Sequence, residues 1–501
     1  MSSSASRILN AALRRKCMSA EEAARLIPDG ANVGMSGFTG AGHPKAVPGA
    51  LAAHILAAHQ AGKRFQIGVW TGASTAPELD GVLAQADGIA LRLPYQSDPV
   101  SRQRINSGEM DYTDIHLSHV AQFVWFGFFG KLDVAVVEVA GILPDGRLIP
   151  SSSVGNNKTW LDQADQVILE VNRRQSAALG GMHDIYYGTA LPPHRKPIPL
   201  LAPGDRIGEA YLRVDPTKVI AVVETDAPDR NAPFSPPDEN SRAIAGHILE
   251  FLQHEVKKGR LPAQLLPLQS GVGNVANAVM AGLQDGPFEN LTAYTEVLQD
   301  GMLSLLKSGK MTLASATAFS LSPDGQAELE AHMGFYRNKI VLRPQEISNH
   351  PELIRRLGVI AMNGLIEADI YGNVNSTHIR GTSIMNGIGG SGDFARNAYL
   401  SIFMTPSSAK GGSVSCIVPM ASHVDHTEHD VQVIVTEQGL ADLRGLAPRQ
   451  RARLLIENCA HPDFRPALRA YFARALRESP GRHTPHLLEQ AFSFLPQRQQ
   501  G

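Results

Sequence analysis

Short runs of apolar residues alternate along the chain with longer segments in which apolar residues recur at helical spacing. Continuous apolar runs at 31–36, 65–70, 134–139, 167–171 and 219–223 predict β-strands. Runs without polar alternation are typical of strands buried on both faces of a mostly parallel sheet. Segment 47–62 is rich in Ala and Leu and predicts a helix, and Ser19 with Glu22 forms a capping-box pattern that predicts another. The pattern therefore indicates the α/β class.

A proline-rich segment at 225–240, TDAPDRNAPFSPPDEN, separates two such alternating regions. Its four prolines argue against regular structure and predict a boundary between a domain at 1–228 and a second domain at 229–501. A long helix is expected to begin near Ser241. Beyond it, the predicted strands are 265–269, 291–295, 340–342, 415–418 and 431–436, and the predicted helices are 274–283, 302–308 and 447–477. Two domains also fit a length of 501 residues.

Composition narrows the class of protein. Hydrophobic residues make up 43% of the chain, and 46 Lys and Arg nearly balance 48 Asp and Glu, so no charge excess indicates nucleic acid or an anionic membrane. Three cysteines are too few for a disulfide framework or a zinc site of the cysteine type. The Ser- and Arg-rich start loosely resembles a transit peptide, but residues 7–13 fit an amphipathic helix. We expect a cytoplasmic protein.

A glycine turn and a later carboxylate form the first candidate site. A predicted strand runs into Gly271-Val272-Gly273, and a helix begins near Asn274, an arrangement that favours anions at the helix N-terminus. Glu296 ends the next strand about 20 residues later, which is the spacing of the acidic residue in dinucleotide-binding folds. An NAD-dependent oxidoreductase and a plain strand–helix turn both remain open at this point.

Two further segments carry candidate chemistry. NGIGGSGD at 386–393 has four glycines in six residues, which can form a nest of backbone N–H groups for an oxyanion or can be a flexible loop. Glu437 follows the apolar run at 431–436, where open α/β sheets place ligands. The histidines at 423, 426 and 429 drift around a helix, so a solvated polar loop is expected there and no metal site is assigned.

Four motifs then carry a resemblance. QSGVGNVANAV, AYTEVLQDGM, NGIGGSGDFAR and VTEQGLADLRG resemble the acetyl-CoA hydrolase/transferase branch of the class I CoA-transferases. The likeness extends from GFTGAGHPK at 37–45 to AHPDFRP at 460–466. It implies two open, mostly parallel α/β domains of similar topology with the active site between them, in a homodimer. It also implies small-molecule partners, namely acyl-CoA and short carboxylates, with coenzyme A as substrate and no permanently bound cofactor.

The resemblance also implies a role for individual residues. Glu296 would attack the acyl-CoA carbonyl and pass through an acyl-glutamyl anhydride and a glutamyl-CoA thioester. Gly389 and Gly390 would donate to the developing oxyanion, Asn349 would orient groups at the site, and Glu437 would be a second active-site carboxylate. Coenzyme A would be contacted by Gly271, Val272, Gly273, Asn274, Val275, Asn386, Gly390 and Lys410. The substrate carboxylate would lie near Ser74 and Arg230.

The expected reaction is transfer of CoA between succinate and acetate, with propionate or another short acid possible. Hydrolysis of acyl-CoA is a close alternative because it requires only that water reach the glutamyl thioester. The oxidoreductase alternative uses Glu296 for a different purpose and would change nicotinamide absorbance on turnover. A non-catalytic CoA-binding protein would retain affinity without exchange, and the presence of Glu296, Glu437 and both glycine segments argues against it.

Overall fold

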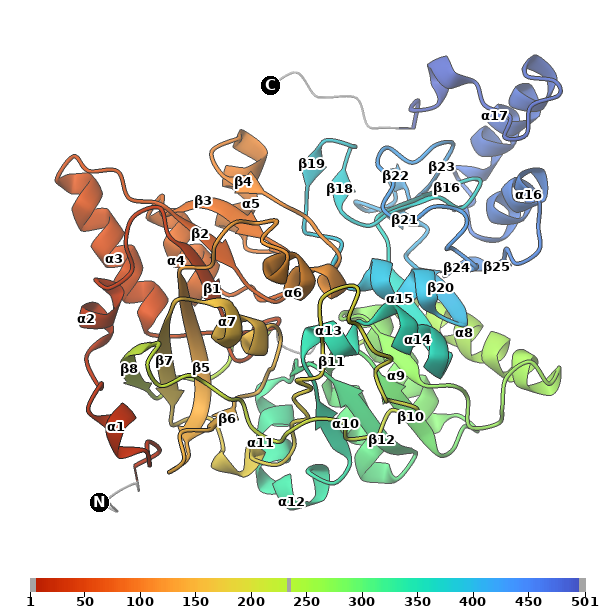
Figure 1. Ribbon diagram of the computed structural model, residues 1–501. Helices are drawn as coiled ribbons and strands as arrows, with labels where there is room; N and C mark the ends of the chain where they lie inside the picture. The colour runs from red at the N-terminus through yellow and green to blue at the C-terminus, as the bar shows by residue number, and fades with distance from the viewer. Residues whose placement is uncertain (1–5, 232–235, 495–501) are drawn as a thin grey trace. The chain divides into compact units, whose positions relative to one another are not determined.

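The computed structural model describes residues 6–231 and 236–494, which form two compact units (Figure 1). One unit contains 6–231, 293–306 and 312–353, and the other contains 236–292, 307–311 and 354–494. Two segments from the middle of the chain therefore complete the first unit. None of the helices within the described ranges is both long and apolar enough to cross a membrane.

The first large sheet has the strand order β4-β3-β2-β1-β5-β7-β8, with β6 paired to β5. Its strands are β1 (Asn32–Met35), β2 (Ile67–Trp70), β3 (Ile89–Leu93), β4 (Asp111–Tyr112), β5 (Val134–Ile142), β6 (Leu148–Pro150), β7 (Gln166–Asn172) and β8 (Val219–Thr225). Every pair along the main path is parallel, and β6 is antiparallel to β5. The apolar runs predicted at 134–139, 167–171 and 219–223 lie within β5, β7 and β8.

Helices cover both faces of this sheet because side chains alternate along each strand. Val33 and Met35 belong to the core that includes Leu51 of α3 (Val47–Gln60). Gly34 faces the other way, where a Cβ would lie 3.0 Å from the ring of Trp160, so this close approach requires glycine. Trp160 lies on α7 (Asn157–Gln163), and its Nε1 donates to the carbonyl of Met35 at 3.1 Å.

The second large sheet has the order β14-β12-β10-β9-β15-β20-β24-β25. Its strands are β9 (Leu268–Ser270), β10 (Leu291–Tyr294), β12 (Met311–Ala316), β14 (Ile340–Leu342), β15 (Ile360–Gly364), β20 (Leu400–Met404), β24 (Val433–Thr436) and β25 (Gly439–Asp442). The pairs β12–β14, β9–β15, β15–β20 and β20–β24 are parallel, whereas β24–β25 is an antiparallel hairpin. The predicted class, α/β with large and mostly parallel sheets in two domains, is confirmed.

Small sheets, with antiparallel and parallel pairs, and further helices also belong to the second unit. The short strands are β16 (Glu367–Asp369), β17 (Val374–Asn375), β18 (His378–Ile379), β19 (Ser383–Ile384), β21 (Ser408–Ala409), β22 (Val414–Ser415) and β23 (Ile417–Val418). The helices include α8 (Glu239–Lys257), α9 (Asn274–Asp285), α15 (Ser391–Asn397), α16 (Pro448–Asn458) and α17 (Arg465–Glu478). One hydrophobic core joins α16 and α17 to β24 and β25 through residues such as Leu455, Leu468 and Ile434.

Three predicted elements differ from the structure for local reasons. The strand expected at 265–269 begins only at Leu268, because Leu265 has a φ of 59°, which no strand residue adopts. The run 415–418 divides at Cys416, whose N–H donates to the carbonyl of Ser407 at 3.0 Å, so β22 and β23 join different small sheets. The helical tail is interrupted between α16 and α17, where Pro462 disfavours a continuous helix.

Candidate active site

Glu296 follows β10 in the first unit, and its backbone is held in place. The next two residues form β11 (Val297–Leu298), which pairs in parallel with β13 (Ala318–Phe319). The carbonyl of Glu296 accepts hydrogen bonds from the backbone N–H groups of Thr317 at 2.9 Å and Ala318 at 3.1 Å. The fold therefore fixes the point from which this half-buried side chain extends.

The carboxylate of Glu296 is held by a buried amide. Asn349 Nδ2 donates to Glu296 Oε1 at 2.7 Å, and the Asn349 side chain lies fully buried at the end of α13 (Gln345–Ser348). The amide of Asn349 is itself oriented, because the Ser348 hydroxyl donates to its Oδ1 at 2.8 Å. With Oδ1 occupied in this way, Nδ2 is directed at the carboxylate. The donated hydrogen bond favours the charged form of Glu296.

Apolar side chains surround the backbone next to this carboxylate. Val297 and Ala318, which flank the Glu296 carbonyl, belong to a small buried cluster with Phe38, Ala73 and Leu117. Such a cluster lowers the local dielectric constant beside the half-buried Glu296 side chain. A carboxylate in these surroundings, with one strong hydrogen bond, is suited to attack an acyl carbon.

Ser74 packs against a glycine loop of the same unit. Its hydroxyl donates to the carbonyl of Thr39 at 3.4 Å, and the N–H of Thr39 donates to the carbonyl of Ala73 at 2.9 Å. Gly37 in this loop has a φ of 117°, and a Cβ there would lie 2.5 Å from the Ser74 hydroxyl. Only glycine therefore allows the loop to reach Ser74. Phe38 and Ala73 connect this loop to the apolar cluster beside Glu296.

Arg230 is attached to the same glycine loop but points to the surface. Its N–H donates to the carbonyl of Gly40 at 2.9 Å, and a Cβ at Gly40 would lie 1.9 Å from the Arg230 carbonyl oxygen. The guanidinium is 67% exposed and pairs with Glu78 at 2.7 Å. Ser74 and Arg230 lie on different segments, and both contact the glycine loop at residues 37–42.

A buried charge network lies beneath this loop, and the sequence analysis missed it. Lys45 Nζ lies 2.6 Å from Glu138 Oε2 and 3.0 Å from Asp229 Oδ1, and all three side chains are buried. Asp229 also accepts hydrogen bonds from the Gly42 N–H and from Gln175, both at 3.0 Å. Burial alone would raise the pKa of Asp229, but Lys45 and these hydrogen bonds hold the pKa below its ordinary value. Asp229 therefore anchors the glycine loop at 37–42, and its neighbour Arg230 contacts the same loop through Gly40.

The sequence does contain a signal for this network, because a charged residue lies within each of two apolar runs. Glu138 interrupts the run VAVVEV in β5, and Glu170 interrupts VILEV in β7. A carboxylate in a strand buried on both faces needs a partner. Glu170 finds its partners at the start of α3, where it accepts hydrogen bonds from the N–H groups of Lys45 at 2.6 Å and Val47 at 3.1 Å. Each interruption therefore indicates a polar cluster.

The first glycine turn of the second unit leads into a helix whose N-terminus has no side-chain cap. Gly273 has a φ of 125° and begins α9, which has no side-chain cap and no acidic residue in its first turn. The N–H of Gly271 donates to the carbonyl of Met362 at 3.1 Å, which fixes the end of β9. Val272, Gly273 and Asn274 are exposed. Such a turn can bind phosphate or another anion.

The second glycine segment of this unit is held by serine and histidine. Gly389 has a φ of 59°, and Gly390 immediately precedes α15. The Ser391 hydroxyl donates to the carbonyl of Ile388 at 2.7 Å and lies 3.1 Å from Nε2 of the buried His426. Asn386 Nδ2 donates to the carbonyl of Gly387 at 3.1 Å. These hydrogen bonds connect the segment to α15 and to His426.

Glu437 is bonded to the hairpin that carries Lys410. The N–H of Ser407 donates to Glu437 Oε2 at 2.7 Å, and the Ser407 hydroxyl donates to Oε1. Burial would raise the pKa of Glu437, but these two bonds and one from Gln438 hold the pKa below its ordinary value. Ser407 precedes β21, and the exposed Lys410 lies in the turn that follows with a φ of 50°. Glu437 thus lies at the base of the Lys410 hairpin.

The predicted residues therefore fall into two groups. Glu296, Asn349, Ser74 and Arg230 belong to the first unit, where Asn349 contacts Glu296 directly and Ser74 and Arg230 each contact the loop at 37–42. The turns at 271–275 and 386–390, together with Lys410 and Glu437, belong to the second unit. The three histidines at 423, 426 and 429 do not converge, since His426 contacts Ser391 whereas His429 is exposed and lies beside Thr427.

Sequence relatives cover nearly the whole chain. It is 50% identical to succinyl-CoA:acetate CoA-transferase of Clostridium kluyveri, an alignment that spans 97% of this chain and 90% of the relative. It is 49% identical to propanoyl-CoA:succinate CoA transferase of Escherichia coli, over 95% of this chain and 96% of the relative. Acetyl-CoA hydrolase of Schizosaccharomyces pombe is 46% identical, over 98% of this chain and 96% of the relative.

Solved structures share the fold. RipA from Yersinia pestis matches with a TM-score of 0.72 at 24% identity, over 94% of this chain and 98% of that chain. A 4-hydroxybutyrate CoA-transferase from Porphyromonas gingivalis matches with a TM-score of 0.62 at 22% identity, over 92% and 98%. Models of the acetyl-CoA hydrolase/transferase N-terminal and C-terminal domains match residues 1–224 and 325–472. This chain therefore belongs to the acetyl-CoA hydrolase/transferase family.

Proposed function

We propose that the protein transfers coenzyme A between short carboxylic acids, with Glu296 as the covalent nucleophile. The observation that carries the proposal is the 2.7 Å hydrogen bond from the buried Asn349 amide to the Glu296 carboxylate. The relatives named as transferases support the reaction class, and they act on succinyl-CoA with acetate and on propanoyl-CoA with succinate. The specific pair proposed for this chain is succinyl-CoA and acetate.

The reaction proceeds through two enzyme-bound acyl species. A carboxylate oxygen of Glu296 attacks the thioester carbon of succinyl-CoA, and the C–S bond breaks. The CoA thiolate departs, and an acyl-glutamyl anhydride remains on the enzyme. The thiolate then attacks the glutamyl carbonyl, which releases succinate and leaves a glutamyl-CoA thioester. Acetate reverses both steps and departs as acetyl-CoA, so that Glu296 is regenerated. The thioester's free energy is retained because the acyl carbon is never hydrolysed.

The glycine segments serve the charges that arise in these steps. Each attack creates a tetrahedral oxyanion, and we assign the backbone N–H groups of Gly389 and Gly390 as its donors. The turn 271–275 would receive CoA, because the α9 amides lack a side-chain cap. Asn386 and the exposed Lys410 would complete the CoA site.

The remaining predicted residues would position the acid and the nucleophile. Ser74 and Arg230 both contact the loop at 37–42. A hydroxyl group and an exposed guanidinium can together bind the carboxylate of the substrate. The hydrogen bonds from Ser407 lower the pKa of Glu437 and so favour its charged form. We therefore assign Glu437 an electrostatic, orienting role and not that of a general acid. Asn349 would hold Glu296 in its attacking orientation.

Hydrolysis of acetyl-CoA is a second candidate, favoured by one observation. The fungal relative from Schizosaccharomyces pombe, at 46% identity over nearly the full length, is named as a hydrolase. Both reactions share the glutamyl-CoA thioester, and they differ in whether a carboxylate or water attacks it. Whether transfer or hydrolysis occurs therefore depends on how well water is excluded from the binding site of the acceptor carboxylate.

Steady-state exchange distinguishes these readings. With succinyl-CoA and acetate, we expect ping-pong kinetics and acetyl-CoA equal to the succinate released. Glu296→Ala should lose exchange by roughly 10⁴-fold or more, whereas the exposed Glu289→Gln should retain it. Free CoA without acetyl-CoA would indicate hydrolysis. Near-normal exchange by Glu296→Ala would contradict the proposed nucleophile.

A further inference from the structure

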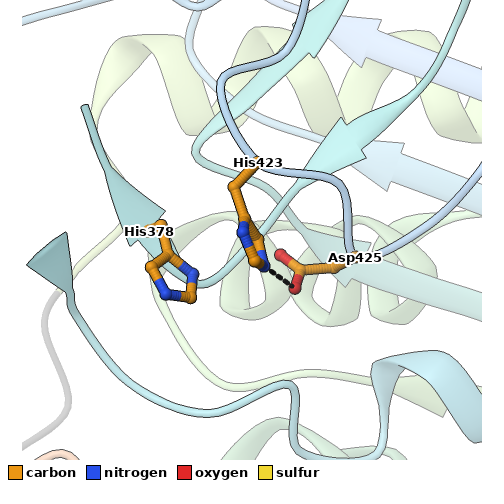
Figure 2. Close-up of side chains that lie close together, drawn as sticks. All are labelled: His378, His423 and Asp425. Atoms are coloured by element: carbon orange, nitrogen blue, oxygen red, sulfur yellow. Dashed lines mark ion pairs between the residues drawn. The ribbon is translucent and has the colours of Figure 1, made fainter. Parts of the chain in front are cut away.

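Two histidines and an aspartate of the second unit converge outside the groups described above. Figure 2 shows His378, His423 and Asp425 as neighbours, although His378 lies in β18 and the other two follow β23. Their imidazole nitrogens and carboxylate oxygen all lie within 4.8 Å of one another. The two imidazole rings lie against each other, with centroids 3.8 Å apart and an angle of 34° between the planes.

Asp425 is held in a fixed orientation at the centre of this cluster. The N–H of Ser376 donates to its Oδ2 at 2.7 Å, and the Thr377 hydroxyl lies 2.9 Å from both carboxylate oxygens. The same Thr377 hydroxyl lies 2.7 Å from His378 Nδ1. One hydroxyl therefore ties a histidine and the carboxylate together. Carboxylates and imidazoles fixed by outer hydrogen bonds are the usual arrangement around a bound metal ion.

The spacing suits a small divalent ion. Bonds of about 2.0–2.1 Å to a tetrahedral ion place neighbouring donor atoms about 3.3 Å apart. His423 Nε2 and Asp425 Oδ1 are 3.2 Å apart, which matches one edge of such a site. The third donor, a ring nitrogen of the half-exposed His378, lies within 4.8 Å of these two atoms.

We propose that His378, His423 and Asp425 form a binding site for a divalent transition-metal ion of the zinc type. Two imidazoles and one carboxylate suit Zn²⁺ and its neighbours in the first transition row better than Mg²⁺ or Ca²⁺. Three protein donors leave at least one position for water. The site is independent of the proposed transfer reaction, because no step of that reaction uses these side chains.

The ion would join two loops that already touch. Gly381, in the turn between β18 and β19, has a φ of 71°, and a Cβ there would lie 2.7 Å from the Ser422 carbonyl oxygen. His378 enters from the hairpin side of this contact, and His423 follows Ser422 on the other. A bound ion would therefore hold the β18–β19 hairpin against segment 422–425, and it would stabilise the folded protein by its binding free energy.

The test is a Zn²⁺ titration of the full chain after treatment with a chelator, in competition with a coloured zinc indicator. We expect one ion per chain at the tightest site, with affinity lowered at least about tenfold in His378→Ala, in His423→Ala and in Asp425→Asn. His429→Ala and His461→Ala change exposed or half-exposed histidines of the same unit and should leave this affinity unchanged. Thermal unfolding in the presence of Zn²⁺ should shift upward in the wild type and in these controls only.

Co²⁺ gives an independent readout, because a tetrahedral site with nitrogen donors has a visible absorption spectrum. We expect that spectrum in the wild type and its loss in the three variants. Asp425→Asn preserves the size of the side chain, and it decides the matter if a histidine variant fails to fold. Equal Zn²⁺ affinity in the wild type and in all folded variants would overturn the proposal. The proposal would also be overturned if the tightest Zn²⁺ binding of the wild type were no stronger than binding to exposed surface histidines.

Discussion

A carboxylate can serve as a nucleophile only where it stays charged and water is kept away. At Glu296 we assign these two roles to different residues. Asn349 donates a hydrogen bond that favours the charged form, and Val297 and Ala318 contribute to the apolar cluster beside it. The amide of Asn349 cannot turn freely, because Ser348 bonds to its oxygen. The residue pair 296 and 349 is thus the smallest unit on which the proposed chemistry depends.

Removing that amide should slow transfer without unfolding the protein. A hydrogen bond to a charged group contributes about 1.5–3 kcal/mol, so Asn349→Ala should lower kcat/KM for acetyl-CoA formation by about 10- to 100-fold. Asn338→Ala is the matched control, because Asn338 is exposed and bonds only weakly to Gly334 at 3.4 Å. An Asn349→Ala enzyme within twofold of the wild type would show that this amide does not position the nucleophile.

His43 gives a prediction for acid stability. It is fully buried, and burial, with Lys45 nearby, lowers its pKa to about 3 from an ordinary 6.5. The unfolded chain therefore binds a proton between pH 6.5 and 3 that the folded chain does not, so stability falls as the pH decreases through this range. Between pH 7 and pH 5, His43 should account for about 2 kcal/mol of lost stability.

His43→Leu removes this titration and should flatten the change. Urea unfolding at pH 7 and pH 5 would measure it: the wild type should lose about 2 kcal/mol more than His43→Leu over this interval. The comparison uses the pH-dependent difference, so any constant effect of the substitution on packing cancels. Equal losses in both proteins would mean that His43 is protonated in the folded state.

The sequence supplied some of these residues and not others. Glu296 could be proposed from its place at a strand end and from the AYTEVLQDGM motif, and Asn349 from the same resemblance. Their hydrogen bond joins residues 53 positions apart, which no local pattern predicts. The Lys45–Glu138 contact spans 93 positions and was missed, although a carboxylate within the apolar run of β5 indicated that a partner must exist.

At the scale of elements, one lysine holds a strand, a loop and the start of a helix together. Lys45 lies two residues before α3, its ammonium lies between Glu138 of β5 and Asp229, and its N–H donates to Glu170 of β7. The glycine loop at 37–42 ends three residues before this lysine. Its geometry, and with it the placement of Ser74 and Arg230, therefore depends on a buried charge cluster and not on apolar packing alone.

Lys45→Met should be strongly destabilising, because it leaves two buried carboxylates without their cation. Removing one partner of a buried pair costs about 3–5 kcal/mol in the free energy of unfolding. The matched control is Lys131→Met, whose ion pair with Asp165 has both side chains more than half exposed and should contribute less than about 1 kcal/mol. Denaturant unfolding at neutral pH compares the two. Similar values for both variants would refute the importance of the cluster.

Strand prediction succeeded where burial was uniform and failed where tertiary contacts intervened. The run at 167–171 lies wholly within β7, because a strand covered on both faces leaves a continuous apolar signal. The run at 415–418 was also predicted as one strand, yet it divides at Cys416, whose N–H donates to the carbonyl of Ser407. Leu265 adopts a left-handed conformation within an apolar run, which the pattern of side chains does not reveal.

At the scale of the whole molecule, the family is established and the specific reaction is a proposal. The relatives at 44–50% identity include enzymes named as transferases and enzymes named as hydrolases. Both reactions can share one nucleophile and one thioester. They would differ in whether water reaches the thioester and in the shape of the binding site for the acceptor carboxylate. Membership in the family also argues against the dinucleotide alternative, because the matching domain models and the relatives at 44–50% identity are those of CoA transferases and acetyl-CoA hydrolases.

The most direct test of the proposed nucleophile is mass spectrometry of the protein after incubation with succinyl-CoA and then borohydride. Borohydride reduces a glutamyl-CoA thioester to an alcohol, so we expect one modified peptide, with the change at Glu296 and no such change in Glu296→Ala. Protein incubated with free CoA should remain unmodified. Full turnover with no modification of Glu296, or trapping at another carboxylate such as Glu437, would contradict the account.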